Sequence, residues 1–402
     1  MNLKRSMIWT AVLAVLLVSP AMAINWQNAK CCDAANCCEE VGCCDAQECC
    51  CPKTVNIEIG GWISSGIYQN QYGANDNGPL TMRNYADGYT LDQMWVYAEK
   101  KADNGGSGLA FGGRVDFMWG ADGPDTQCFG DGGWDGGWMT SNDNNYGSAL
   151  PQLYAEIAYN DLRVKVGHFY TIIGYEVVPA PDNFFYSHSY ALAIEPFTHM
   201  GALAEYDVTD RLTIHGGWTN GWDNGWINPT NASTFLGGAS VKLRNNMSLT
   251  YATSFGDLQE NAGTTWTTYL QSLVFKWQVS RRLQYIMQSD FRTDSDEFTG
   301  NALKYYGINQ YLLYKISNRW AAGARVEWFR DEARLGGQAG INTVNSTGIT
   351  LGLNYTPRKN IIIRPEIRWD ASGASPSNFA QHFDNNTRSS QFSGGFDCIF
   401  KF

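Results

Sequence analysis

The chain of 402 residues carries 39 acidic and 29 basic side chains, which gives a formal net charge of -10. Because nucleic-acid-binding domains present basic surfaces, this balance argues against a nucleic-acid partner. The mean hydropathy of -0.32, the 14% aromatic residues and the 42 glycines fit a soluble all-β protein as well as a membrane barrel, so composition leaves the location open.

The first 23 residues have the pattern of a secretory signal peptide. Lys4 and Arg5 precede an apolar run from Met7 to Val18, and Ala-Met-Ala ends at Ala23. The run is shorter than the roughly 20 residues that a membrane-spanning helix needs. We therefore expect cleavage after Ala23.

Residues 24–53 form a Cys-rich segment that we interpret as a periplasmic arm. Its cysteines recur every six residues: Cys31, Cys32, Cys37, Cys38, Cys43, Cys44, Cys49, Cys50 and Cys51. Disulfides are the default in an exported protein, and an odd number of thiols leaves one free or bonded to another molecule. Thiolates also bind soft metals, but the spacing lacks the paired C-x₂-C form of zinc sites. We expect intermolecular disulfides and assign no metal or cofactor.

From residue 54 to residue 402 the sequence predicts an all-β fold, a transmembrane antiparallel barrel of sixteen strands. Segments of about 9 to 14 residues alternate with period two, the length that a tilted strand needs to cross a membrane. The expected strands are Val55–Tyr68, Thr90–Lys100, Leu109–Trp119, Leu153–Tyr159, Leu162–Phe169, Phe197–Tyr206, Arg211–Thr219, Thr234–Arg244, Met247–Phe255, Trp266–Val279, Leu283–Arg292, Tyr305–Ile316, Trp320–Arg330, Gly348–Tyr355, Ile361–Trp369 and Ser389–Phe402.

The connections between these strands alternate in length. Those after even-numbered strands are short, such as Asn160-Asp161 and Asn245-Asn246, whereas those after odd-numbered strands are long. Short periplasmic turns and long external loops are typical of outer-membrane barrels. This pattern predicts an outer-membrane location with both termini in the periplasm.

Side-chain parity assigns one face of each strand to lipid and the other to water. In the closing strand Phe392, Phe396, Phe400 and Phe402 share the lipid face with Cys398. The residues that face water by parity include both signs of charge, and they do not settle a charge preference for a solute: Arg114, Asp116, Arg163, Lys165, His215, Lys242, Arg244, Asp290, Arg292, Arg325, Glu327, Arg364, Glu366, Arg368 and Asp370.

The third long loop, residues 170–195, is unusually apolar for a segment exposed to solvent. We expect it to fold into the lumen as a constriction, the alternatives being a cap over the mouth or a subunit contact. The hypothesised pore-lining residues are Glu176, Asp182, His188 and Glu195 of this loop together with Arg163, Lys165, Arg364 and Arg368 of the wall.

No motif in the sequence indicates an enzyme. The histidines form no H-x-x-x-H pair and there is no G-x-S-x-G elbow, so we assign no catalytic residue. Asp122, Asp125, Asp131, Asp135 and Asp143 lie in the second long loop without the spacing of a calcium loop, which favours an ordinary hydrophilic surface loop.

The run from Gly167 to Asp223 contains GHFYTIIGYE, NFFYSHSY and EPFTHMGALAEYDVTDRLTIHGGWTNGWD. It resembles the β-barrel porins of bacterial outer membranes called OmpL-like, in a Gly-His/Arg-Phe strand end, an aromatic loop, a Thr-His-x-Gly strand and a Gly-x-x-Asn-Gly-Trp-Asp turn. The resemblance implies a channel for small solutes. The Cys-rich arm lies outside that pattern.

Two functions follow from these patterns. The first is an outer-membrane porin for passive diffusion of small hydrophilic solutes. The second is a structural outer-membrane protein that anchors the envelope through its Cys-rich arm, as a homo-oligomer or with an envelope partner joined by disulfides.

Overall fold

The computed structural model describes residues 57–73, 77–83, 88–128, 135, 145–229, 231–259, 265–296, 302–332, 343–375, 383–384 and 387–402. The signal peptide, the Cys-rich arm and its nine cysteines, Asp131, Asp143 and His382 lie outside the described residues. None of the helices in the described part has the length and apolarity to cross a membrane.

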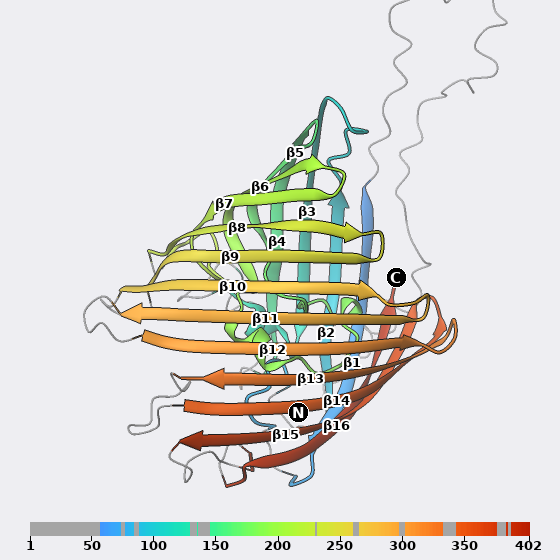
Figure 1. Cartoon of the computed structure of the whole chain (residues 1–402). Coiled ribbons are helices and arrows are strands. Elements are labelled where there is room, and N and C mark those ends of the chain that lie inside the picture. The colour runs from blue at the N-terminus through green and yellow to red at the C-terminus, as the bar shows by residue number, and fades with distance from the viewer. Residues whose placement is uncertain are drawn as a thin grey trace, which may run out of the picture.

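Sixteen strands form one closed barrel, which confirms the predicted fold (Figure 1). Their bounds are β1 (Glu58–Asn70), β2 (Tyr89–Lys100), β3 (Leu109–Gly120), β4 (Gly147–Tyr159), β5 (Leu162–Tyr170), β6 (Thr198–Thr209), β7 (Leu212–Thr219), β8 (Ser233–Arg244), β9 (Met247–Gln259), β10 (Thr265–Gln278), β11 (Leu283–Asp296), β12 (Ala302–Lys315), β13 (Trp320–Asp331), β14 (Thr343–Arg358), β15 (Ile361–Ser375) and β16 (Ser390–Lys401). The short helices α2 (Gly123–Thr126), η1 (Ala180–Asp182) and η2 (Tyr190–Ile194) lie in loops.

Each strand pairs antiparallel with its neighbours in sequence, and β16 closes the barrel against β1. In that last pairing Ile67 lies opposite Phe396 and Ile63 opposite Phe400. Closure satisfies the backbone hydrogen bonds of both edge strands, which no open sheet could do in lipid.

The alternation of side chains on β16 distinguishes the outer face of the barrel from its inner face. Phe396 is 50% exposed on the outer surface and Cys398 is also exposed, whereas Asp397 and Ile399 are fully buried inside the barrel. The apolar outer face and polar inner face follow directly from the period of two.

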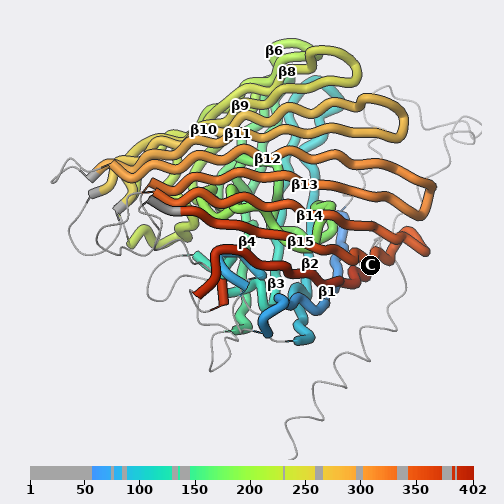
Figure 2. Tube along the Cα trace, turned by 60° about the horizontal axis from the view of Figure 1, so that its bottom comes forward, coloured from blue at the N-terminus to red at the C-terminus, as the bar shows by residue number. Residues whose placement is uncertain are grey.

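The tight turns gather at one end of the barrel and the longer loops at the other (Figures 1 and 2). In the two-residue turn between β4 and β5, Asn160 has a φ of 51° and its Oδ1 accepts a hydrogen bond from the Gly108 backbone. Asn tolerates this left-handed conformation better than most residues, which suits it to the turn.

Several strands are longer than the sequence pattern predicts. β4 begins at Gly147 instead of Leu153, β14 begins at Thr343 instead of Gly348, and β15 ends at Ser375 instead of Trp369. The added residues are mostly small or polar and carry no alternating signal. They are strand because the neighbouring strand supplies hydrogen-bond partners, as Ser375 and Thr343 do for each other's strands.

Candidate functional site

The segment from residue 171 to residue 197, here called the inner loop, lies inside the barrel, as predicted from its apolarity (Figure 1). It contacts inward-facing residues of β2, β11, β13 and β15. Its apolar side chains pack among lumen residues and are buried, notably Ile173, Val178, Phe185, Tyr186 and Tyr190. Burial of this surface explains why an apolar sequence occurs in a loop.

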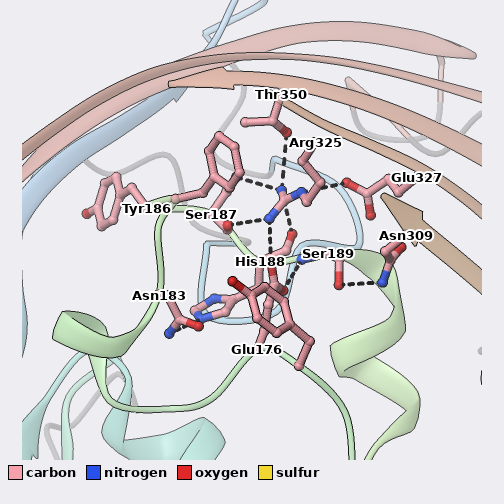
Figure 3. A network of polar contacts seen from close by, with 12 residues as sticks. Glu176, Asn183, Tyr186, Ser187, His188, Ser189, Asn309, Arg325, Glu327 and Thr350 are labelled. Atoms are coloured by element: carbon pink, nitrogen blue, oxygen red, sulfur yellow. Dashed lines mark hydrogen bonds and ion pairs between the residues drawn. The ribbon is translucent and has the colours of Figure 1, made fainter. Parts of the chain in front are cut away.

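Arg325 of β13 anchors the middle of the inner loop (Figure 3). Its Nη1 lies 2.8 Å from Glu176 Oε1 and donates to the Ser187 carbonyl at 2.7 Å, while Nη2 donates to the His188 carbonyl at 3.1 Å. The guanidinium is fully buried, so it depends on these acceptors to replace water.

Arg364 of β15 holds the preceding part of the inner loop. Its Nη1 donates to the carbonyls of Ala180, Asn183 and Phe185 at 2.8, 2.7 and 3.1 Å. Its other nitrogens pair with Asp397 of β16 at 2.9 and 2.6 Å. One arginine thereby joins a turn of the inner loop to two wall strands.

Arg368, four residues further along β15 and on the same face, makes a similar connection. It donates to the His188 carbonyl at 2.8 Å and pairs with Glu327 at 2.9 Å and Asp370 at 2.8 Å. A row of buried charges thus runs across β13, β15 and β16 beneath the inner loop, with opposite signs adjacent to one another.

Wall carboxylates accept the backbone N–H groups of the same segment. Glu366 accepts from Tyr186 at 2.7 Å and from Ser187 at 3.1 Å. Glu327 accepts from Tyr190 at 2.7 Å, and the Tyr190 hydroxyl donates to Asp370 at 2.6 Å. The backbone polar groups of a buried loop would otherwise be unsatisfied.

Two glutamines hold the parts of the inner loop that flank the arginine contacts. Gln93 of β2 donates to the Val178 carbonyl at 2.8 Å and accepts from the Ala180 backbone at 3.0 Å. Gln288 of β11 accepts from the Tyr175 backbone at 3.0 Å and donates to Glu195. The inner loop is therefore fixed along its length against one side of the wall. That side runs from β11 to β16 and continues through β1 to β2.

The inner loop carries ionisable groups whose pKa values are shifted. Burial raises the pKa of Glu176, but the charge of Arg325 together with His188 and the hydrogen bonds from Ser189 leaves the pKa below its ordinary value. Burial lowers the pKa of His188 to about 4, so its imidazole is neutral near pH 7. Burial and the neighbouring Asp290 raise the pKa of Glu195 well above its usual range.

The first long loop also enters the barrel. Arg83 pairs with Asp122 at 2.8 Å and with Asp92 at 3.4 Å, and its guanidinium carbon lies 4.2 Å from the centre of the Tyr186 ring. Leu80 packs in one buried cluster with Tyr186. The inner loop is thus covered by a second segment of the chain.

The interpretation of the second long loop as an ordinary hydrophilic surface loop is wrong for two of its three described aspartates. Asp122 and Asp135 are fully buried, whereas Asp125 is exposed. Asp122 pairs with Arg83, and Asp135 accepts backbone hydrogen bonds from Cys128 and Leu150. These carboxylates satisfy buried donors, which a spacing pattern could not reveal. Within the described residues, no group of three or more His, Cys, Asp or Glu side chains is placed to hold a metal ion.

Some space remains in the lumen beside β4 to β7. A cavity of about 170 Å³ lies between these strands and the start of the inner loop, and Arg163, Lys165, Glu156, Glu205 and His215 line it. Arg163 pairs with Glu205 at 2.8 Å, and the Lys165 Nζ lies 5.1 Å from the centre of the Tyr154 ring.

The eight hypothesised pore-lining residues occupy two kinds of position. Arg163 and Lys165 line the cavity, and Asp182 is exposed on the inner loop. Glu176, His188 and Glu195 are only 7%, 4% and 7% exposed, and Arg364 and Arg368 are buried beneath the loop. Their contacts are with protein groups.

Sequence reasoning missed three residues that hold the loops. Gln93 and Gln288 face inward by strand parity, but the prediction named only charged residues and histidines on the inner face. Arg83 lies in a loop, where no periodicity applies. Arg325, Glu327, Glu366 and Asp370 were placed on the wet face correctly, but parity could not say that a loop would cover them.

Comparison with known proteins agrees with this architecture. The model of the family described as beta-barrel porin-2, OmpL-like, matches residues 56–402. No curated protein matches the chain in sequence.

Solved outer-membrane proteins share the fold at low identity. An anion-selective porin from Comamonas acidovorans is 9% identical with a TM-score of 0.57, over 86% of this chain and 99% of that chain. The outer-membrane channel DcaP of Acinetobacter baumannii is 11% identical with a TM-score of 0.57, over 86% and 97%. The trimer form of OmpT of Vibrio cholerae is 11% identical with a TM-score of 0.55, over 86% and 99%. At such identities the likeness shows the fold alone.

Proposed function

Because the chain belongs to the beta-barrel porin-2, OmpL-like family, we propose that it is an outer-membrane porin through which small hydrophilic solutes diffuse passively. The closed barrel supplies the apolar exterior and polar interior that a water-filled channel requires. The observation that carries the proposal is the inner loop, which occupies the lumen and is fixed there by buried arginines of the wall.

The inner loop acts as the constriction. Residues of the wall and of the loop have different roles in it. Arg364 and Arg368, with Arg325, position the loop, while Glu176, His188 and Glu195 secure it from the loop side. Arg163 and Lys165 line the space that remains beside β4 to β7, and Asp182 is exposed on the inner loop. Charged groups that border a narrow passage select among solutes.

Planar-bilayer recording of the purified protein tests the constriction. Deleting Gly174–Ser189 removes most of the anchored part of the loop, and we expect a larger single-channel conductance than in the wild type. The deletion variant must keep the heat-dependent gel migration of a folded barrel. An unchanged conductance in a folded variant would refute the role of the loop.

Liposome swelling tests the channel itself. Vesicles that contain the wild-type protein should swell in sugars and amino acids, whereas protein-free vesicles should not. A folded barrel that admits no solute would leave the anchoring function as the better explanation.

We place the short turns and both termini in the periplasm. The first and last strands of the barrel pair close to the C-terminus, since the Gly61 backbone donates to the Phe402 carbonyl at 3.1 Å. This pairing lies at the short-turn end of the barrel (Figure 1). An epitope inserted at Asn245-Asn246 should be reached by antibody only after the outer membrane is permeabilised. Labelling of intact cells would reverse the orientation.

The remaining parts of the assignment stay predictions. We propose transport without catalysis, export through the signal peptide 1–23, and homo-oligomerisation or a disulfide-bonded envelope partner through the Cys-rich arm. Electrophoresis with and without reductant tests the last of these.

A further inference from the structure

A second, more open pocket lies at the short-turn end of the barrel. Its volume is about 450 Å³, and we call it the basic vestibule after the four cations that line it: Arg211 in the turn between β6 and β7, Lys242 and Arg244 of β8, and Lys276 of β10. Asp210 is the one carboxylate in its lining.

Strand parity places two of these cations, Lys242 and Lys276, on the inner face. Lys242 shares the parity of Leu236 on β8, which is buried in the lumen, whereas the adjacent Leu243 is exposed on the outer surface. Arg244 follows a β-bulge after Lys242 and Arg211 lies in a turn, so both contribute to the pocket from the end of the barrel wall. Lys276 shares the parity of Leu270 and Val274, which are likewise buried. Lys242 and Lys276 therefore point into water inside the barrel and away from lipid.

The vestibule differs from the rest of the lumen in its charge balance. Arg163, Arg325, Arg364 and Arg368 each pair with a carboxylate. Among the residues that the structure describes, none of the four vestibule cations has a carboxylate within 4.0 Å. Lys242 donates only to the Asp210 backbone carbonyl at 3.3 Å, and the Lys276 Nζ lies 4.9 Å from the centre of the Tyr175 ring.

Like charges gathered in one concave space repel each other unless an anion joins them. The field of several cations focuses in a cleft, which raises the local concentration of anions there. A volume of about 450 Å³ lies within the range of sites that enclose small molecules. Arginine matches carboxylate and phosphate oxygens with two parallel hydrogen bonds, and lysine adds a mobile point charge.

We propose that the basic vestibule is a binding site for small organic anions that carry two or more carboxylate or phosphate groups. A singly charged solute would leave most of the repulsion in place, whereas a polyvalent one bridges cations on β8 and β10. The site adds a saturable step to passive diffusion. It depends on the inner face of the barrel only, and it would exist in a barrel that conducts nothing.

Isothermal titration calorimetry of the full-length protein in detergent tests the site. Citrate and pyrophosphate serve as probes at low ionic strength, with glucose and spermidine as neutral and cationic comparisons. We expect saturable binding of both anions, weakening as salt is raised, and none of the comparison solutes.

The triple variant K242Q/R244Q/K276Q should raise the Kd of citrate and pyrophosphate by about tenfold or more, since it removes three of the four charges that the anion would bridge. The matched control R319Q/R358Q/K359Q removes three exposed cations from the same end of the barrel, next to other turns, and should leave the Kd unchanged. The three single variants serve if the triple one does not fold, each with a smaller rise in Kd.

Equal weakening in both triple variants would overturn the site, because it would reduce the effect to net charge. Absence of saturable anion binding in the wild-type protein would overturn it as well. Bilayer conductance in KCl, recorded on the same preparations, separates this outcome from failure of the proposed function: a conducting protein that binds no anion refutes the site alone, and an anion-binding protein that conducts nothing refutes the porin alone.

Discussion

The guanidinium of Arg325 lies 2.8 Å from the carboxylate of Glu176, although the two residues are separated by 149 positions in the chain. Both side chains are buried, the first on the barrel wall and the second on the inner loop. Their contact is a buried ion pair that joins the inner loop to the wall.

Breaking this pair should release the inner loop. Arg325→Met leaves Glu176 as a buried carboxylate without its partner, which costs about 3 to 5 kcal/mol. We expect larger and noisier single-channel currents. The double variant E176Q/R325M removes both charges and should recover part of the wild-type conductance. Arg330→Met breaks a partly exposed pair with Glu332 and should have little effect. Wild-type currents in the Arg325→Met channel would contradict the coupling.

Gly174 sets the course of the inner loop. Its φ is +85°, and a Cβ there would lie 2.1 Å from Glu195 Oε2. Gly174→Ala should therefore displace the loop and increase hydrogen–deuterium exchange across residues 171–197. Gly373→Ala adds a methyl group where no atom lies within 4 Å, and its exchange should match the wild type. Equal exchange in the two variants would show that the loop does not need this backbone conformation.

A charged side chain on the lipid-facing surface should destabilise the barrel. Ile367 of β15 is 63% exposed on the outer face, and Ile367→Lys should cost about 2 to 4 kcal/mol in folding free energy near the midplane. His215→Lys places the same side chain on the inner face near Glu205 and should cost much less. Urea titrations of refolding into lipid vesicles measure both. Similar costs for the two changes would mean that the faces are assigned incorrectly.

His188 should make the stability depend on pH. Its folded pKa of about 4 lies below the ordinary 6.5, because burial disfavours the imidazolium. The contribution of His188 to the free energy of unfolding is fully present above pH 6.5. It is lost as pH falls from about 6.5 to 4, because the unfolded chain takes up the proton at a higher pH than the folded chain does. Wild type should lose up to roughly 3 kcal/mol relative to His188→Gln over that window. Thermal unfolding of both proteins as a function of pH checks this, and a constant difference would exclude the effect.

Much of the fold could be predicted from local pattern. The alternation in segments such as Leu162–Tyr170 fixes which side chains face lipid, because a slip of one residue would move Arg163 and Lys165 into the membrane. The alternation of short and long connections then fixes the strand count and the two ends of the barrel. Strand limits such as that of β4 were less certain, since small and polar residues become strand only where a neighbour pairs with them.

The sequence by itself determined that this chain closes into a sixteen-strand barrel and that the apolar segment after β5 must be buried, because period-two alternation and hydrophobic burial are local properties. Only the tertiary structure decided which wall groups hold that segment, such as Arg364 beneath Ala180 and Glu366 beneath Tyr186. It also brought Arg211, Lys242 and Lys276 to one cavity. Those contacts join strands that lie far apart in the chain, and their energies depend on positions in space that no local pattern specifies.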